Sequence, residues 1–192
     1  MTRTVQPRRP RLGARSWLLI FFFLALDSLM IPSAHGQDGH ESSLSEGEVD
    51  RLRESAISPP DRLTVFIGFL NDRMTRIAKL SGGPRKPGRE EDLHEMMEQC
   101  TAIFDDLTDN LDDYSKRHRD VRKVLPKVIA GTEVWGTSLK TPPEDQAYSV
   151  SRKLALESLR DVHETAVRLL EEQKTWFAAH PPLKDASRAA GQ

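Results

Sequence analysis

The sequence has one cysteine, few aromatic residues and almost no net charge. With Cys100 alone, neither an internal disulfide nor a zinc site built on cysteines can form. A formal net charge of -1 argues against a basic nucleic-acid-binding protein. The chain also has no Gly-x-Ser-x-Gly elbow, no complete phosphate-binding loop and no Cys-x-x-Cys-His sequence. We therefore predict that the protein is not an enzyme, and that it has no catalytic, cofactor-binding or metal-binding residues.

The chain has one long hydrophobic run, WLLIFFFLAL at residues 17–26. An arginine-rich start without acidic residues precedes it, and Ala34 and Gly36 stand at the -3 and -1 positions of a cleavage site. This pattern predicts a secretory signal peptide over residues 1–36 and a periplasmic or extracellular protein. A retained membrane anchor is the alternative. A spanning helix needs about 20 apolar residues, however, and Asp27 interrupts the run, so we expect no stable membrane span after cleavage.

Apolar residues recur at steps of three and four through most of the remaining chain, which predicts helices rather than strands. Ser45 and Glu48 match a capping box at the start of a short helix. Ser58-Pro59-Pro60 breaks this helix, and an apolar stripe between Leu63 and Leu80 then predicts its continuation.

A second segment keeps one apolar phase from Leu93 to Trp135. This predicts a single helix of up to about 50 residues, with a kink at Pro126 near the carbonyl of Arg122. Thr141-Pro142-Pro143 ends the second segment, and a third helix follows, with Gln173 as the one polar break in its apolar frame.

These segments predict an all-α fold, an elongated antiparallel bundle of three long helices with the first helix broken. A four-helix bundle is the alternative, if the second helix opens near Asp112-Asp113. We expect the bundle domain over residues 45–179, between disordered segments at residues 37–44 and 180–192. The unbroken apolar phase equally suits a homo-oligomer.

The second helix changes the sign of its charge along its length. Within residues 89–113, every charged residue except Arg89 is acidic. Within residues 116–127, every charged residue except Asp120 is basic. One interpretation is a partner-binding basic patch, made of Lys116, Arg117, Arg119, Arg122 and Lys123. The other is internal pairing that fixes the register of the bundle. In that case the basic stretch lies beside acids of the first and third helices, namely Glu46, Glu48, Asp50, Glu54, Glu157, Asp161 and Glu164.

Other candidate residues favour packing over chemistry. Cys100 falls in the apolar frame and is expected to be a small buried hydrophobe. His118 also falls in the frame, where Glu164 is a candidate partner, and His94 belongs to the only Glu-x-x-His spacing. Trp135, near Tyr148, and Trp176 are expected to cap the ends of the bundle. The loop at residues 82–89 is predicted to be a solvated basic turn that could touch an anionic surface.

The stretch YSKRHRDVRKVLPKV, followed by a tryptophan and a Pro-Pro-Glu-Asp turn, resembles uncharacterised exported helical proteins of soil bacteria. The resemblance covers most of the chain after the signal peptide and implies no activity.

The sequence thus predicts an exported, non-enzymatic helical protein that acts as a protein-interaction or adaptor module of the cell envelope. Its partner is an unknown protein or a second copy of the chain, and nucleic acid is excluded. The alternative function is a helical bundle that binds a small molecule or a metal.

Overall fold

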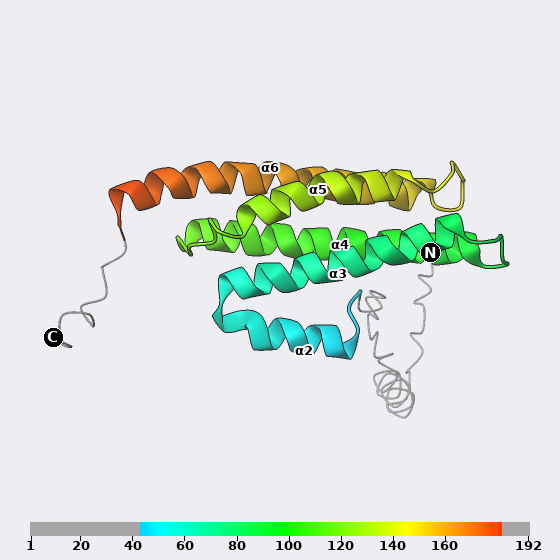
Figure 1. Ribbon diagram of the computed structural model, residues 1–192, viewed down its shortest axis with the longest axis horizontal. Coiled ribbons are helices and arrows are strands. Elements are labelled where there is room, and N and C mark those ends of the chain that lie inside the picture. Colours follow the sequence, from blue (N-terminus) through cyan, green and yellow to red (C-terminus); the bar gives the residue numbers. More distant parts are fainter. Residues whose placement is uncertain (1–42, 182–192) are drawn as a thin grey trace, which may run out of the picture. The chain divides into compact units, whose positions relative to one another are not determined.

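The computed structural model describes residues 43–181, which form five α-helices and one turn of 3-10 helix (Figure 1). The elements are α2 (Glu46–Glu54), the 3-10 turn η2 (Ser55–Ile57), α3 (Pro59–Gly82), α4 (Arg89–Lys116), α5 (Leu125–Lys140) and α6 (Ser149–Ala179). No strand occurs within residues 43–181, so the predicted all-α bundle is confirmed. None of the helices described here is long and apolar enough to cross a membrane.

The ends of the chain are described only in part. The predicted signal peptide at residues 1–36 lies outside the described residues, as do residues 37–42 and 182–192 of the two predicted tails. Ser43 and Leu44, which we also predicted to be disordered, pack against the bundle instead. Leu44 is only 8% exposed, and the carbonyl of Ser43 accepts a hydrogen bond from Arg73 at 3.0 Å.

Local sequence signals start α2, α3 and α4 close to where they were expected, whereas α6 begins only at Ser149. The backbone N–H of Ser45 donates to the Glu48 carboxylate at 2.8 Å, as in the predicted capping box. Pro59 and Pro60 occupy the first turn of α3, where their missing N–H groups cost nothing. Gly88, with a φ of 83°, precedes α4 and lets the chain turn sharply into that helix.

Successive helices run in opposite directions, and this places α4 and α6 parallel to each other (Figure 1). Three polar contacts link these two helices at nearly the same sequence separation, as a parallel pair requires. They are His94 with Ser151, Asp112 with Arg168, and Ser115 with Glu172. By contrast, α3 pairs antiparallel with α4 through Arg62–Asn110 and Arg73–Gln99. The bundle therefore brings the last part of α6 to the end of α4.

The prediction of one continuous second helix is wrong. It is divided into α4 and α5 by residues 117–124, so the four-helix alternative describes the long helices better. The break lies beyond Asp112-Asp113, and α4 ends in a Schellman motif. In this motif, the His118 N–H donates to the Ser115 carbonyl at 3.2 Å, and the Arg119 N–H donates to the Tyr114 carbonyl at 2.9 Å.

The expected kink at Pro126 is also replaced by this break. Pro126 lies in the first turn of α5, a position that suits proline. Tyr114 before the break, Val121 within it and Leu125 after it are all buried, so the connection preserves the apolar phase although it is not helical. A periodicity that survives a loop explains why the sequence suggested one helix.

Most predicted frame residues form the core. The α4 residues that the phase predicted to be inside are all buried, namely Leu93, Met97, Cys100, Phe104, Leu107, Leu111 and Tyr114. Trp135 is fully buried within α5, where its ring lies 5.9 Å from that of Phe104 and its indole N–H donates to Asn71 at 2.8 Å. It is therefore a central core residue rather than an end cap. Tyr148 donates to the Pro143 carbonyl at 2.7 Å.

Candidate functional site

The five residues predicted to bind a partner lie together between α4 and α5. Lys116 is the last residue of α4, and the others belong to the connection that follows. We call the set the basic loop: Lys116, Arg117, Arg119, Arg122 and Lys123. All are exposed except Arg122, which is partly buried.

The acids that were expected to neutralise this stretch lie elsewhere. Several of them pair with other basic residues: Glu48 with Arg73, Glu157 with Lys153, and Glu164 with Arg160. For the acids of α6, the physical reason is the parallel pairing of α4 with α6. The end of α4 lies beside Glu172, which Ser115 contacts, and not beside the earlier residues Glu157, Asp161 and Glu164. Within residues 43–181, no ion pair joins the basic stretch to the acids that were expected to neutralise it.

Only part of the basic loop is paired with acids. Arg117 bonds to Asp113 at 2.7 Å, and Arg122 bonds to both carboxylate oxygens of Asp120 at 2.9 and 2.7 Å. The bond from Arg122 holds the pKa of Asp120 below its usual range. Lys116, Arg119 and Lys123 form no ion pair with any residue between 43 and 181, although Lys123 lies close enough to Asp120 to help lower the pKa of its carboxyl.

An aromatic cluster lies beside the basic loop, at the end of α6. The His118 ring stacks on Trp176, with centroids 4.2 Å apart and planes 10° apart, and the His180 ring stacks on the same indole at 4.4 Å. Phe177 meets Trp176 edge-on at 4.7 Å, and the Arg122 guanidinium lies 4.4 Å from the Phe177 centroid. Trp176 and Phe177 are both partly exposed, so this cluster combines apolar area with positive charge at the surface.

The backbone of the basic loop is held by a buried glutamine. Gln173 is 3% exposed; its amide N–H donates to the Arg119 carbonyl at 2.7 Å, and its oxygen accepts from the Val121 N–H at 3.1 Å. The polar break in the third apolar frame thus has a structural reason. A polar residue inside an apolar frame was the one sequence signal that could have pointed to this contact.

His118 has a different role from the predicted one. Its φ of 50° puts it in the left-handed region, at the position of the Schellman motif where glycine is usual. A left-handed conformation costs a residue with a side chain about 1–2 kcal/mol, and stacking on Trp176 offsets part of this cost. Glu164, its expected partner, contacts Arg160.

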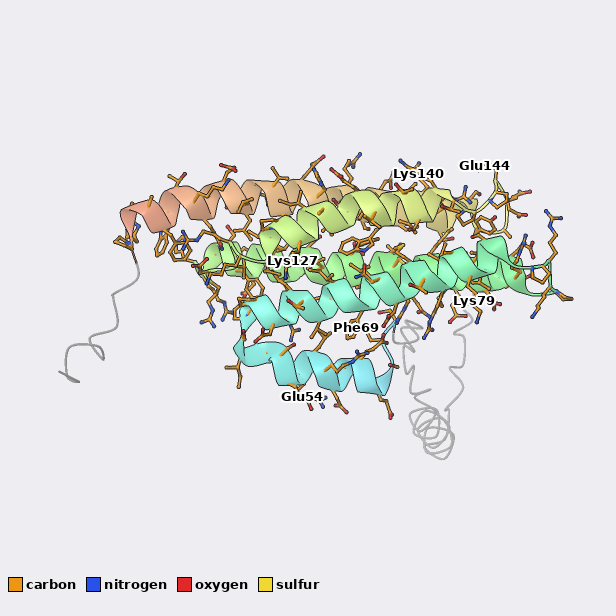
Figure 2. The ribbon with its side chains drawn as sticks, in the orientation of Figure 1. Glu54, Phe69, Lys79, Lys127, Lys140 and Glu144 are labelled. Carbon is orange, nitrogen blue, oxygen red and sulfur yellow. The ribbon has the colours of Figure 1, made fainter. Side chains whose placement is uncertain are left out.

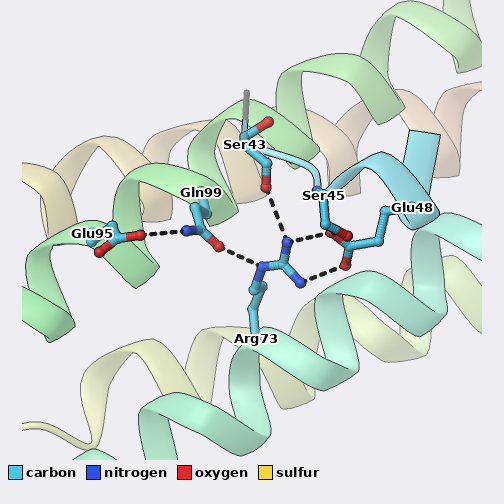
Figure 3. Close-up of polar contacts among 6 residues, drawn as sticks. All are labelled: Ser43, Ser45, Glu48, Arg73, Glu95 and Gln99. Atoms are coloured by element: carbon cyan, nitrogen blue, oxygen red, sulfur yellow. Dashed lines mark hydrogen bonds and ion pairs between the residues drawn. The ribbon is translucent and has the colours of Figure 1, made fainter. Parts of the chain in front are cut away.

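A second polar cluster joins α2, α3 and α4 and is fully paired (Figure 3). Arg73 donates to both carboxylate oxygens of Glu48 at 2.7 and 3.0 Å, to Gln99 at 2.7 Å and to the Ser43 carbonyl. The bond from Arg73 lowers the pKa of Glu48 from 4.5 to about 2. A polar cavity of about 360 Å³ lies beside this cluster. Because every nitrogen of the Arg73 guanidinium already has an acceptor, the cluster serves to dock α2 rather than to bind a ligand.

The remaining candidate residues have structural settings. Cys100 is fully buried, and burial raises the pKa of its thiol to about 12, as expected for a core residue rather than a nucleophile. His94 lies between Ser151, at 3.1 Å, and Glu98, at 3.2 Å. Within residues 43–181, no three His, Cys, Asp or Glu side chains gather closely enough to hold a metal ion.

Comparison with known proteins adds no relative: no family model, curated protein or solved structure gives a significant match. The resemblance to exported helical proteins of soil bacteria stays a prediction. The argument for function therefore depends on the basic loop and the aromatic cluster.

Proposed function

We propose that this protein is an exported, non-enzymatic helical bundle that binds an acidic protein partner through the basic loop, as an interaction or adaptor module of the cell envelope. The observation that carries this proposal is that Lys116, Arg119 and Lys123 are exposed, lie close together in the chain and form no ion pair within the described part of the chain. Because internal pairing does not account for these cations, an external acidic surface is the better explanation for their clustering.

The neighbouring aromatic residues support the same proposal. Protein interfaces are enriched in tryptophan, phenylalanine and arginine, and their binding energy is concentrated in a few such residues surrounded by a polar rim. Trp176 and Phe177 provide partly exposed apolar area, and the basic loop provides a charged rim around it. The bonds from Gln173 hold the loop backbone in one conformation, which lowers the entropy lost on binding.

The partner test is an in-cell crosslinking pull-down of the full-length protein, read by mass spectrometry. The test variant carries Lys116→Glu, Arg119→Glu and Lys123→Glu, and we expect it to recover at least about tenfold less of an acidic partner than wild type. The control variant carries Lys140→Glu, Lys153→Glu and Arg160→Glu, which changes the net charge equally at exposed positions far from the basic loop.

The outcomes separate the alternatives. Loss of the partner in the test variant alone supports the proposal, whereas equal recovery from both variants contradicts it. Crosslinks between copies of this chain, and to no other protein, would replace the acidic partner by a second copy.

Export needs a separate test, because residues 1–36 lie outside the described residues. We expect the protein from fractionated cells to be outside the cytoplasm and to begin at residue 37 on N-terminal sequencing. Cytoplasmic protein with residues 1–36 intact would contradict this part of the proposal. Membrane-bound protein with an intact N-terminus would indicate the retained anchor.

A further inference from the structure

A cavity of about 440 Å³ lies at the hairpin between α3 and α4, at the opposite end of α4 from the basic loop. It is bounded by the last turns of α3, by residues 83–87 of the connection and by the first turns of α4. Lys79, which lines it, lies near the hairpin, whereas Lys127 lies near the start of α5 (Figure 2). The volume falls in the range of small-molecule sites, about 300–1,000 Å³.

One part of the cavity wall is apolar. Leu80 at the end of α3 and Met96 in α4 contribute flexible hydrocarbon surface. Pro84 and Pro87 add rigid apolar rings and have no backbone N–H group that could donate a hydrogen bond to water in this part of the cavity. A short hydrocarbon chain that packs against this part of the wall would be removed from water, which is favourable.

The charged part of the wall is predominantly positive. Four cationic residues line the cavity against two carboxylates, and the cations are Arg76, Lys79, Lys86 and Arg89. The carboxylates belong to Asp92 and Glu95, which are both exposed. The Glu95 carboxylate accepts a hydrogen bond from Gln99 at 2.9 Å, and this bond directs it towards the Arg73 cluster. Arg89 pairs with Glu90, which leaves three other lining cations against these two carboxylates, so the wall keeps a small excess of positive charge.

Arg89 is the residue that points to a ligand. It is 8% exposed, and its terminal nitrogen bonds to Glu90 at 3.1 Å. Its Nε is buried and has no hydrogen-bond acceptor within residues 43–181. A buried donor without an acceptor is costly in a folded protein and needs an explanation, of which a bound water or ion is one. The Nε of Arg152 is also buried and unpaired within the described residues, but Arg152 does not line this cavity.

The start of α4 adds to this setting. Arg89 is the first residue of the helix, Gly88 before it provides no capping side chain, and Glu90, Glu91 and Asp92 follow in the first turn. The positive end of the helix dipole and the Arg89 guanidinium are therefore at the same point in the chain, an arrangement that favours an anion.

From these observations we propose that the hairpin cavity binds a small amphipathic anion. A carboxylate or phosphate group is held near Arg89 by the surrounding cations, and a short hydrocarbon body packs against Leu80, Met96 and the two prolines. This inference does not depend on the proposed partner binding, since the two sites lie at opposite ends of α4.

The test is isothermal titration calorimetry of the full-length protein with octanoate, octyl phosphate, acetate and 1-octanol. We expect octanoate or octyl phosphate to bind at least about tenfold more tightly than acetate, which lacks the hydrocarbon body, and than octanol, which lacks the charge. The tighter of the first two ligands identifies the head group as a carboxylate or a phosphate. If neither binds more tightly than acetate and octanol, the proposal is wrong.

Variants locate the binding. Lys79→Gln with Lys86→Gln removes two exposed cavity cations without touching the core, and we expect about tenfold weaker binding of the preferred ligand. Lys127→Gln with Lys174→Gln, at exposed positions that do not line the cavity, is the matched control, and we expect no change. Arg89→Gln should weaken binding further, with its folding checked by circular dichroism. Equal affinities for wild type and the cavity variant, or an equal loss in the control, would overturn the proposal.

Discussion

Gly131 leaves the space that the indole ring of Trp135 occupies, so a side chain at this position would clash with the ring. A Cβ atom at this position would lie 2.6 Å from Cζ2 and 2.7 Å from Cη2 of Trp135, one turn later in α5. The indole cannot move aside easily, because it is fully buried and bonded to Asn71. The glycine therefore allows the largest core side chain to lie flat against its own helix.

We predict that Gly131→Ala lowers the free energy of unfolding by about 1–3 kcal/mol, the usual cost of overpacking a core. The control is Gly68→Ala in α3, where an added Cβ has no neighbour within 4 Å. It should raise stability by up to about 1 kcal/mol, since alanine is the better helix former. Urea denaturation followed by tryptophan fluorescence measures both. A Gly131→Ala protein as stable as wild type would mean that the indole can relocate.

The connection between α4 and α5 depends on an interaction with a distant helix. Gln173 in α6 satisfies the Arg119 carbonyl and the Val121 N–H, which have no partner in a helix. These two hydrogen bonds take the place of the backbone hydrogen bonds that a continuous helix through residues 117–124 would have made.

We predict that Gln173→Leu destabilises the protein by about 2 kcal/mol or more. The substitution removes the hydrogen-bond partners of the Arg119 carbonyl and the Val121 N–H, and it leaves the buried Val121 N–H unpaired. Chemical denaturation measures this loss. Lys174→Leu, on the exposed face of the same turn, serves as the control and should change stability by less than about 0.5 kcal/mol. Equal effects of the two substitutions would argue against the hydrogen bonds as the cause.

The docking of α2 depends on an ion pair that titrates in acid. The pKa of Glu48 is about 2 in the folded protein, below its ordinary value of 4.5. Because the folded-state value is the lower one, the ion pair stabilises the fold fully above about pH 4.5, and this contribution is lost as the pH falls towards 2. It is on the order of 3 kcal/mol, by the usual conversion of pKa shifts.

Glu48→Gln should therefore be less stable than wild type at pH 7 by several kcal/mol, as expected when a buried arginine loses its carboxylate. The difference between the two proteins should shrink between pH 4.5 and 2, because wild type loses the same charge there. Urea midpoints across this range provide the measurement, with the exposed Glu54→Gln as the control. A difference that is independent of pH would show that the charge of Glu48 is not what stabilises α2.

The four long helices share one core, and Cys100 reports on its opening. The thiol is fully buried, and its pKa is raised to about 12, so both exposure and ionisation require that the surroundings open. We predict that a thiol reagent at pH 8 does not modify the native protein, and that modification appears along the urea transition measured by circular dichroism. Rapid modification without urea would reveal a local opening, and α2 would be its first candidate because its Glu48 pairs with Arg73, which lies near the thiol.

Much of the fold could be predicted from short-range patterns. The capping box at Ser45, the prolines at the start of α3 and the apolar phase of α4 all act within a few residues of each other, and each prediction is confirmed. The break after Lys116 could not be predicted in this way. Its Schellman motif uses a histidine in place of the usual glycine, and Val121 and Leu125 preserve the helical phase across it.

The candidate site was predicted in part. The basic loop was identified by charge alone, because five cations within eight residues are visible in any arrangement of the chain. The stacking of neighbouring His118 on Trp176 and the support of the loop backbone by Gln173 were not visible, since each joins residues more than 50 positions apart. The hairpin cavity was likewise visible only as a basic turn.

The sequence by itself therefore determined the helical class, most helix ends and the buried faces, because these depend on propensity and periodicity along one segment. The tertiary structure alone decided the parallel pairing of α4 with α6, and with it the neighbours of the basic loop. The reason is that exposed ion pairs are weak, about 0–1 kcal/mol each, so they do not choose the register. The direction in which α5 leaves the broken helix makes that choice, because it sets which apolar faces meet in the shared core.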